Sequence, residues 1–156
     1  MALQVGQKAP DFSLYDSDKK KVNLSDYQGK KVLILFFPQA FSGICTTELC
    51  SVRDNISAYE GVDAEVLAIS VDSVNSLNRF KQDQSYNFTL LSDFNKDTSR
   101  SYEAIYENWV LDMKGVSKRS AFVIDREGII QYAEVSESPA DIPNFEAIQA
   151  VLAKIA

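Results

Sequence analysis

Short apolar runs alternate with amphipathic stretches along most of the chain. Four runs are short and rich in β-branched and aromatic residues, which is typical of buried strands, and they cover residues 31–37, 64–72, 88–93 and 120–125. Elsewhere apolar residues recur at three- and four-residue spacing, which predicts helices over residues 45–59, 74–84, 98–106 and 145–155. Strands and helices that alternate in this way predict an α/β sandwich.

The last part of the chain makes the predicted sheet mixed. Residues 120–125 and 129–135 flank the turn Arg126-Glu127-Gly128 and are expected to form an antiparallel hairpin. Strand–helix–strand units over residues 31–72 and 64–93 are instead expected to be parallel, with right-handed crossovers. Two short strands and one irregular segment complete the prediction, at residues 12–15, 22–24 and 107–118.

Both cysteines lie in one stretch, residues 37–53, directly after the predicted central strand. Pro38 ends that strand, and Cys45 lies where a loop becomes a helix. The exposed N–H groups and the dipole of a first helical turn favour a thiolate over a thiol. Cys45 is therefore a candidate nucleophile at the carboxyl end of the central strand, where open α/β sheets usually bind their ligands.

Composition and charge limit which partners and which cellular compartment are expected for this chain. The chain has 22 acidic and 16 basic residues scattered along it, a net charge of −6, which argues against nucleic acid as a partner. With 46% hydrophobic residues it can build one core, and we expect a single domain over residues 1–156. The longest apolar run, residues 32–37, is far shorter than the ~18 residues of a membrane-spanning helix, and residues 1–7 do not resemble a signal peptide. We therefore expect a cytoplasmic protein with no membrane partner.

The sequence contains no histidine, and this narrows the chemistry further. Ser-His-Asp and Cys-His hydrolases use imidazole as a general base, and most zinc sites need histidine or more cysteines, so these classes are excluded and no metal is expected. A nucleophilic Cys45 must instead be ionised by the helix terminus, a nearby cation, and hydroxyl or backbone donors. Two cysteines in a cytosolic protein favour transient redox chemistry over a structural disulfide.

The segment around Cys45 resembles the active-site signature of the peroxiredoxins. The spacing Pro38-x-x-x-Ser42-x-x-Cys45 is similar to the family's Pro-x-x-x-Thr/Ser-x-x-Cys, and Arg119 stands just before a predicted strand, where the family keeps its active-site arginine. Three further blocks match in the right order, at residues 9–12, 90–93 and 122–128. Residues 37–45 look most like the alkyl hydroperoxide reductase E type, whereas Cys50 resembles the second cysteine of the bacterioferritin comigratory protein, or peroxiredoxin Q, type.

The resemblance implies a thioredoxin-like fold, with a mixed central sheet and helices on both faces, and a thiol-dependent peroxidase without a cofactor. Its substrates would be hydrogen peroxide and small organic hydroperoxides, attacked by the Cys45 thiolate to give a sulfenic acid. Arg119 would favour the thiolate and hold a peroxide oxygen, Ser42 would bond the same oxygens, and Pro38 would cover the sulfur. For Glu48, one turn beyond Cys45, two interpretations stay open: it orients Arg119, or it is a solvated acid of the first turn.

Cys50 is the candidate resolving cysteine. Five residues along an intact helix separate Cα atoms by roughly 8 to 9 Å and point side chains about 140° apart, whereas a disulfide needs about 4.4 to 6.8 Å. The helix must therefore unwind before Cys50 can condense with the Cys45 sulfenic acid, and a thioredoxin-like donor would then reduce the disulfide. The alternatives are a one-cysteine enzyme resolved by an external thiol, and a non-catalytic redox sensor or interaction protein on the same fold.

The resemblance also implies a homodimer formed through loops that flank the active site. Phe41, Tyr106 and Trp109 are the candidate contact residues.

Overall fold

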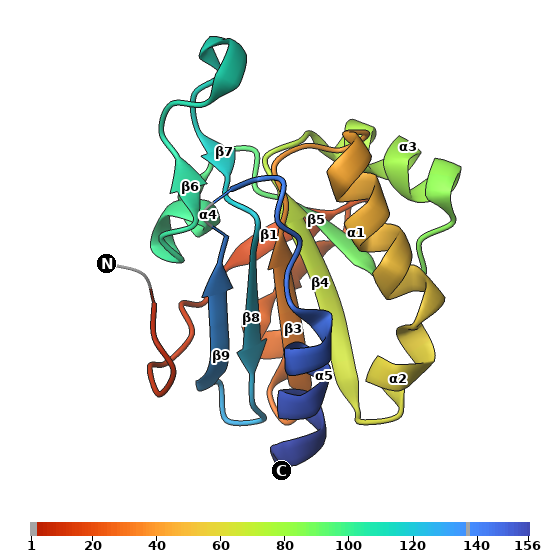
Figure 1. Ribbon diagram of the computed structural model, residues 1–156, viewed down its shortest axis with the longest axis vertical. Helices are drawn as coiled ribbons and strands as arrows, with labels where there is room; N and C mark the ends of the chain where they lie inside the picture. The colour runs from red at the N-terminus through yellow and green to blue at the C-terminus, as the bar shows by residue number, and fades with distance from the viewer. Residues whose placement is uncertain (1–2, 137) are drawn as a thin grey trace.

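A computed structural model describes residues 3–136 and 138–156 of the chain (Figure 1). Its main feature is a seven-stranded sheet with the strand order β2-β1-β5-β4-β3-β8-β9. The strands are β1 (Ser13–Asp16), β2 (Lys21–Asn23), β3 (Lys31–Phe36), β4 (Ala64–Ser70), β5 (Thr89–Ser92), β8 (Ser120–Ile124) and β9 (Ile130–Val135). The mixed sheet expected from the sequence is confirmed, because β3, β4 and β5 are parallel whereas β1, β2, β8 and β9 pair antiparallel.

The central strand β3 is buried along its whole length because both faces of the sheet are covered. Leu33 and Leu35 face a core that includes residues of α1 (Gly43–Asp54), α2 (Ile56–Glu60), α3 (Val74–Gln84) and α5 (Phe145–Lys154). Val32, Ile34 and Phe36 face a second core, which the N-terminal segment and the residues after α4 (Asp97–Ser101) complete. Helices thus cover the first face, and the N-terminal segment with the chain around α4 covers the second, in a thioredoxin-like α/β fold.

One predicted helix is shorter than expected and another is interrupted. The helix expected over residues 98–106 ends at Ser101, because Glu103 has φ of 53° and turns the chain out of the helix. Residues Ile105–Tyr106 form β6, which pairs with β7 (Val116–Ser117) in a separate two-stranded sheet, and the intervening chain contains the 3₁₀ turn η2 (Val110–Asp112). The helix expected over residues 45–59 is divided into α1 and α2 at Asn55.

Two further short features lie before β3 and at the start of α3. The turn before β3 is the 3₁₀ helix η1 (Leu24–Tyr27), and Ser73 caps α3 by accepting a hydrogen bond from the Ser76 N–H. No helix within the described residues is long and apolar enough to cross a bilayer.

Candidate active site

The loop between β3 and α1 brings Cys45 to the carboxyl end of the central strand. Pro38 is buried just after β3, and Phe41 has φ of 69°, which turns the chain toward the helix. Ser42 is the N-cap residue of α1, and its carbonyl accepts hydrogen bonds from the Thr46 N–H at 2.9 Å and the Thr46 hydroxyl at 2.8 Å. Cys45 is therefore fixed in the first turn of α1, with its side chain fully buried.

Arg119 reaches the same edge of the sheet from a distant part of the sequence. In the antiparallel pair β3–β8, Phe36 at the end of β3 lies opposite Ser120 at the start of β8. The residue before Ser120 therefore lies beside the loop that follows Phe36. Sheet register, and not proximity in sequence, thus places the guanidinium of Arg119 next to Cys45.

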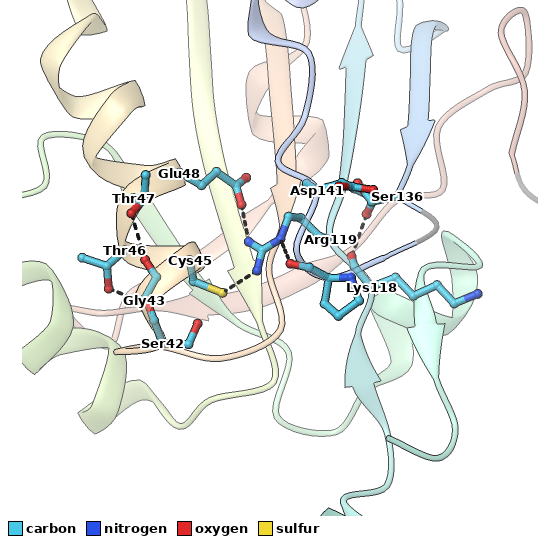
Figure 2. A network of polar contacts seen from close by, with 12 residues as sticks. Ser42, Gly43, Cys45, Thr46, Thr47, Glu48, Lys118, Arg119, Ser136 and Asp141 are labelled. Carbon is cyan, nitrogen blue, oxygen red and sulfur yellow. Dashed lines mark hydrogen bonds and ion pairs between the residues drawn. The ribbon is translucent and has the colours of Figure 1, made fainter. Parts of the chain in front are cut away.

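The guanidinium of Arg119 donates to three acceptors and is only 2% exposed. Its Nη2 lies 3.2 Å from the Sγ of Cys45, its Nη1 lies 2.5 Å from Oε1 of Glu48, and its Nε donates to the carbonyl of Pro139 at 2.8 Å. Figure 2 shows Cys45 and Glu48, both on α1, pointing toward the guanidinium. The planar fork is therefore held in one orientation by a carboxylate and a carbonyl while one nitrogen faces the sulfur.

Glu48 is an orienting residue and not a solvated acid. Its side chain is completely buried, and its Oε2 has no hydrogen-bond partner among the described residues. Burial raises the pKa of Glu48 to about 7, although the charge of Arg119 and its hydrogen bond act in the opposite direction. Burial alone would lower the pKa of Arg119, but the neighbouring Cys45 and Glu48 raise it, so the guanidinium stays charged.

This cluster contains one cation that faces two groups able to become anions. A buried cation and a single anion are neutral together, whereas a second buried anion adds an uncompensated charge. With its raised pKa, Glu48 is largely protonated below neutral pH, which leaves the charge of Arg119 to Cys45. The arrangement can therefore stabilise a thiolate without histidine, and no group of three or more potential metal ligands occurs in the described part of the chain.

Ser42 and Pro38 lie on the same loop as Cys45. Ser42 is half-buried and makes no side-chain capping hydrogen bond to α1, so its hydroxyl is not committed to the helix end. Pro38 is buried near the start of this loop, just after the end of β3. The three residues of the sequence motif and the distant arginine thus converge on one edge of the sheet.

Cys50 lies away from this convergence, within the intact helix α1. Both cysteines are free thiols. The Sγ of Cys50 lies 3.5 Å from Oε1 of Gln84 and 3.7 Å from the hydroxyl of Tyr86, on the side of the helix that faces the end of α3. The expectation that the helix must open before the cysteines can meet is consistent with this geometry.

Two contacts of this region involve groups that the sequence pattern does not indicate. Tyr86 contacts Cys50 but belongs to no motif. The carbonyl of Pro139 accepts a hydrogen bond from Arg119, and a backbone carbonyl occurs in every residue type, so the sequence does not single it out. Of the proposed dimer residues, Phe41 is 51% exposed and its ring centroid lies 5.0 Å from that of Phe80. Trp109 stacks on Tyr106 at 6.0 Å between ring centroids.

The arrangement suits nucleophilic attack by sulfur on a bond whose departing atom gains negative charge. Such a reaction needs a thiolate and a donor directed at the site where charge develops. Cys45 can supply the first, and Arg119, with donors in a fixed fork, can supply the second. Hydroperoxides, with a weak O–O bond and an oxygen leaving group, meet this description.

Comparisons with known proteins identify the family. A model of the AhpC/TSA family matches residues 5–133. Alkyl hydroperoxide reductase E of Mycobacterium tuberculosis is 40% identical over 138 residues, which cover 86% of this chain and 87% of that protein. Peroxiredoxin Bcp of Escherichia coli is 37% identical over 132 residues, 83% of this chain and 84% of that protein.

Solved structures agree with the sequence comparisons. The crystal structure of peroxidoxin BcpB from Mycobacterium tuberculosis has a TM-score of 0.86 to this chain at 26% identity, and the match covers 96% of both chains. Both types that the sequence resembles, alkyl hydroperoxide reductase E and Bcp, occur among these relatives. The chain therefore belongs to the AhpC/TSA family and is a peroxiredoxin.

Proposed function

We propose that this thiol-dependent peroxidase reduces hydrogen peroxide and small organic hydroperoxides through Cys45. The observation that carries the assignment is the 3.2 Å contact between the Arg119 Nη2 and the Cys45 Sγ in a site where both side chains are buried. The Cys45 thiolate attacks one peroxide oxygen in line with the O–O bond. The S–O bond forms as the O–O bond breaks, and the departing oxygen takes up a proton and leaves as water or an alcohol.

Arg119, Ser42 and Pro38 complete the proposed site. The guanidinium holds the attacked peroxide and stabilises charge on the departing oxygen, and Glu48 keeps the fork in the orientation that allows this. The uncommitted hydroxyl of Ser42 can hydrogen-bond the peroxide oxygens. Pro38, buried beside the loop, limits access of water to the sulfur.

Cys50 is the proposed resolving residue. After local unwinding of α1, its thiol condenses with the Cys45 sulfenic acid, forming the S–S bond and releasing water. A thioredoxin-like protein then reduces the disulfide. In the second candidate function an external thiol resolves the sulfenic acid and Cys50 only packs, which the contacts of Cys50 with Gln84 and Tyr86 in the intact helix would permit.

The partners follow in part from the family. A peroxiredoxin needs a hydroperoxide and a thiol reductant, and we propose that the reductant is thioredoxin-like and that the protein acts in the cytoplasm, where thiols are kept reduced. We also propose a homodimer through the loops near the site, for which the half-exposed Phe41 is one contact candidate. Tyr106 and Trp109, stacked on each other in the β6–β7 hairpin, are the others.

Peroxide-dependent turnover with thioredoxin tests the assignment on wild type, Cys45→Ser and Cys50→Ser. We expect Cys45→Ser to be inactive and Cys50→Ser to undergo a single oxidation event. Mass spectrometry of the peroxide-treated wild type should reveal the loss of two hydrogens and a link between both cysteine peptides. An adduct that requires added thiol, with Cys50 free, would favour the one-cysteine enzyme. Oxidation of Cys45 no faster than that of a free thiol would instead support a redox sensor.

A further inference from the structure

The hydroxyl of Tyr86 contacts both ends of the helical turn that separates the two cysteines. It lies 3.5 Å from the carbonyl oxygen of Thr46, the residue directly after Cys45, and 3.7 Å from the Sγ of Cys50. In an α-helix the carbonyl of residue 46 accepts from the N–H of residue 50. Tyr86 therefore braces the turn that must open before a disulfide between Cys45 and Cys50 can form.

Elements outside α1 hold this hydroxyl in place. Ser85 ends α3 in the left-handed region, with φ of 52°, and the Tyr86 N–H then donates to the carbonyl of Lys81 at 3.1 Å. The Tyr86 ring packs against Phe80 and Phe88, with centroids 5.1 and 5.2 Å away, and the residue is only 4% exposed. None of these contacts involves a residue of α1, so they hold the hydroxyl independently of that helix.

The Tyr86 hydroxyl can form hydrogen bonds with the Thr46 carbonyl and the Cys50 thiol at the same time. A tyrosine hydroxyl has one proton to donate and lone pairs that accept, so it can donate to the Thr46 carbonyl and accept from the Cys50 thiol. Burial and the hydrogen bond with Cys50 raise the pKa of Tyr86, so the hydroxyl keeps its proton. Gln84 offers the Cys50 thiol a second acceptor at 3.5 Å. The resting position of Cys50 is thus a polar one, built by residues at the end of α3.

We propose that Tyr86 is a positioning residue for the resolving step, whose hydroxyl keeps α1 folded and thereby sets how long the Cys45 sulfenic acid survives. The inference rests on the proposed two-cysteine function. Two reactions compete for the sulfenic acid. Condensation with the Cys50 thiol forms the S–S bond, breaks the S–O bond and releases water, whereas a second hydroperoxide molecule oxidises the sulfenate to sulfinate and is itself reduced to water or an alcohol. By delaying the first reaction, Tyr86 favours the second.

The test compares wild type with Tyr86→Phe and Tyr59→Phe. Tyr86→Phe removes only the hydroxyl and keeps the ring against Phe80 and Phe88. Tyr59→Phe is the matched control, because Tyr59 is buried in the same core cluster and its hydroxyl accepts from Gln149, on α5, at 3.5 Å. The reduced full-length proteins are mixed rapidly with hydrogen peroxide, quenched with a thiol-alkylating reagent and analysed by mass spectrometry for sulfenic acid, disulfide and sulfinic acid.

We expect Tyr86→Phe to form the disulfide about threefold to tenfold faster than wild type, because loss of one hydrogen bond of ordinary strength shifts an opening equilibrium by about that factor. Its yield of sulfinic acid at excess peroxide falls accordingly, and Tyr59→Phe behaves as wild type. Oxidation of Cys45 is followed in the same experiment, so a general loss of activity is distinguished from a change in resolution. Hydrogen exchange of the reduced proteins gives a second readout, in which the amides of residues 46–50 exchange faster in Tyr86→Phe while those of β3 stay protected.

Several results would overturn the inference. Unchanged or slower disulfide formation in Tyr86→Phe would do so, as would an equal acceleration in Tyr59→Phe, which would indicate general loosening of the core. Unchanged protection of residues 46–50 would also contradict it. Wild type that is oxidised at Cys45 and never links to Cys50 would refute the two-cysteine function itself, and the inference with it, so the two failures are distinguishable before any variant is made.

Discussion

Replacement of Arg119 by methionine should destabilise the protein in a way that depends on pH through Glu48. The experiment is best made in a Cys45→Ser background, so that no thiol faces Arg119. In this structure Oε1 of Glu48 is bound by Arg119 at 2.5 Å, and Oε2 has no partner among the described residues. Breaking a buried ion pair costs about 3–5 kcal/mol when the remaining charge stays uncompensated. Glu48 can avoid part of that cost by keeping its proton.

The pKa of Glu48 determines at which pH values the destabilisation appears. Burial raises it from 4.5 to about 7, so the folded protein keeps this proton at pH values where the unfolded chain has lost it. The contribution of Glu48 to stability therefore falls as the pH rises from about 4.5 to about 7 and then levels off. Without Arg119, whose charge lowers the pKa, the pKa moves above 7 and the fall continues, at about 1.4 kcal/mol per pH unit. The destabilisation caused by Arg119→Met should thus be about 1 kcal/mol larger at pH 8 than at pH 7.

Denaturant unfolding of Cys45→Ser, with and without Arg119→Met, measures this difference at the two pH values. The matched control adds Glu48→Gln to Arg119→Met, which removes the titrating group, so the destabilisation should no longer grow with pH. A destabilisation by Arg119→Met that is the same at pH 7 and pH 8, or a pH dependence that persists with Gln at position 48, would refute the reasoning. With Cys45 present, Arg119→Met should slow the oxidation of Cys45 by about 10²–10³, the typical effect of losing one donor to a developing oxyanion.

Three further predictions concern the helix start, the end of α5 and the β6–β7 hairpin. Ser42→Ala should slow Cys45 oxidation in stopped-flow mixing and lower the free energy of unfolding by less than about 0.5 kcal/mol, because the hydroxyl does not cap α1; a full capping cost of about 1 kcal/mol would contradict this. Lys31→Met should lower thermal stability by about 1 kcal/mol while Cys45 oxidation is unaffected, since the buried ammonium donates to the Leu152 carbonyl at 2.8 Å near the end of α5; an unchanged melting temperature would count against that contact. Gly115→Ala should increase hydrogen exchange in the β6–β7 hairpin, because Gly115 has φ of +73° and a Cβ there would lie 2.4 Å from the Lys96 side chain; unchanged protection would show that the hairpin tolerates the strain.

The sequence predicted the sheet well because its strands are short apolar runs separated by clear turns. It failed over residues 98–106, where Tyr102, Ile105 and Tyr106 have helical spacing. Tyr102 is fully buried in the second core, and Glu103 turns the chain immediately afterwards so that Ile105 begins a strand. Spacing alone does not distinguish a continuous helix from a helix that turns into a strand, because the turn depends on how the Tyr102 ring packs in the core.

Some residues of the site could likewise be predicted from the sequence, and others could not. Cys45, Ser42 and Pro38 are recognisable because they lie at fixed spacing in one loop, and Arg119 because it precedes a predicted strand. The burial of Glu48 could not be predicted, because it depends on how α1 packs against the guanidinium of Arg119, which lies just before β8. The contact of Tyr86 with Cys50 likewise depends on the packing of α1 against the end of α3. The local sequence motif therefore identifies the reacting sulfur, whereas the side chains that position the site can be identified only from the tertiary packing.

In the proposed cycle, the change at Cys45 itself loosens the part of α1 that must move. The thiolate interacts with Arg119 as an anion, and this interaction weakens once the sulfur becomes a neutral sulfenic acid. The charge of Arg119 then faces Glu48 alone, which stabilises the ionised carboxylate and the ion pair with the second turn of α1. The helix is thus held at Glu48 and released before it, so unwinding is confined to the residues that carry Cys45. Among the described residues, the hydrogen bond between Tyr86 and the Thr46 carbonyl still restrains that segment from outside the helix, which gives this hydroxyl its influence on the rate of resolution.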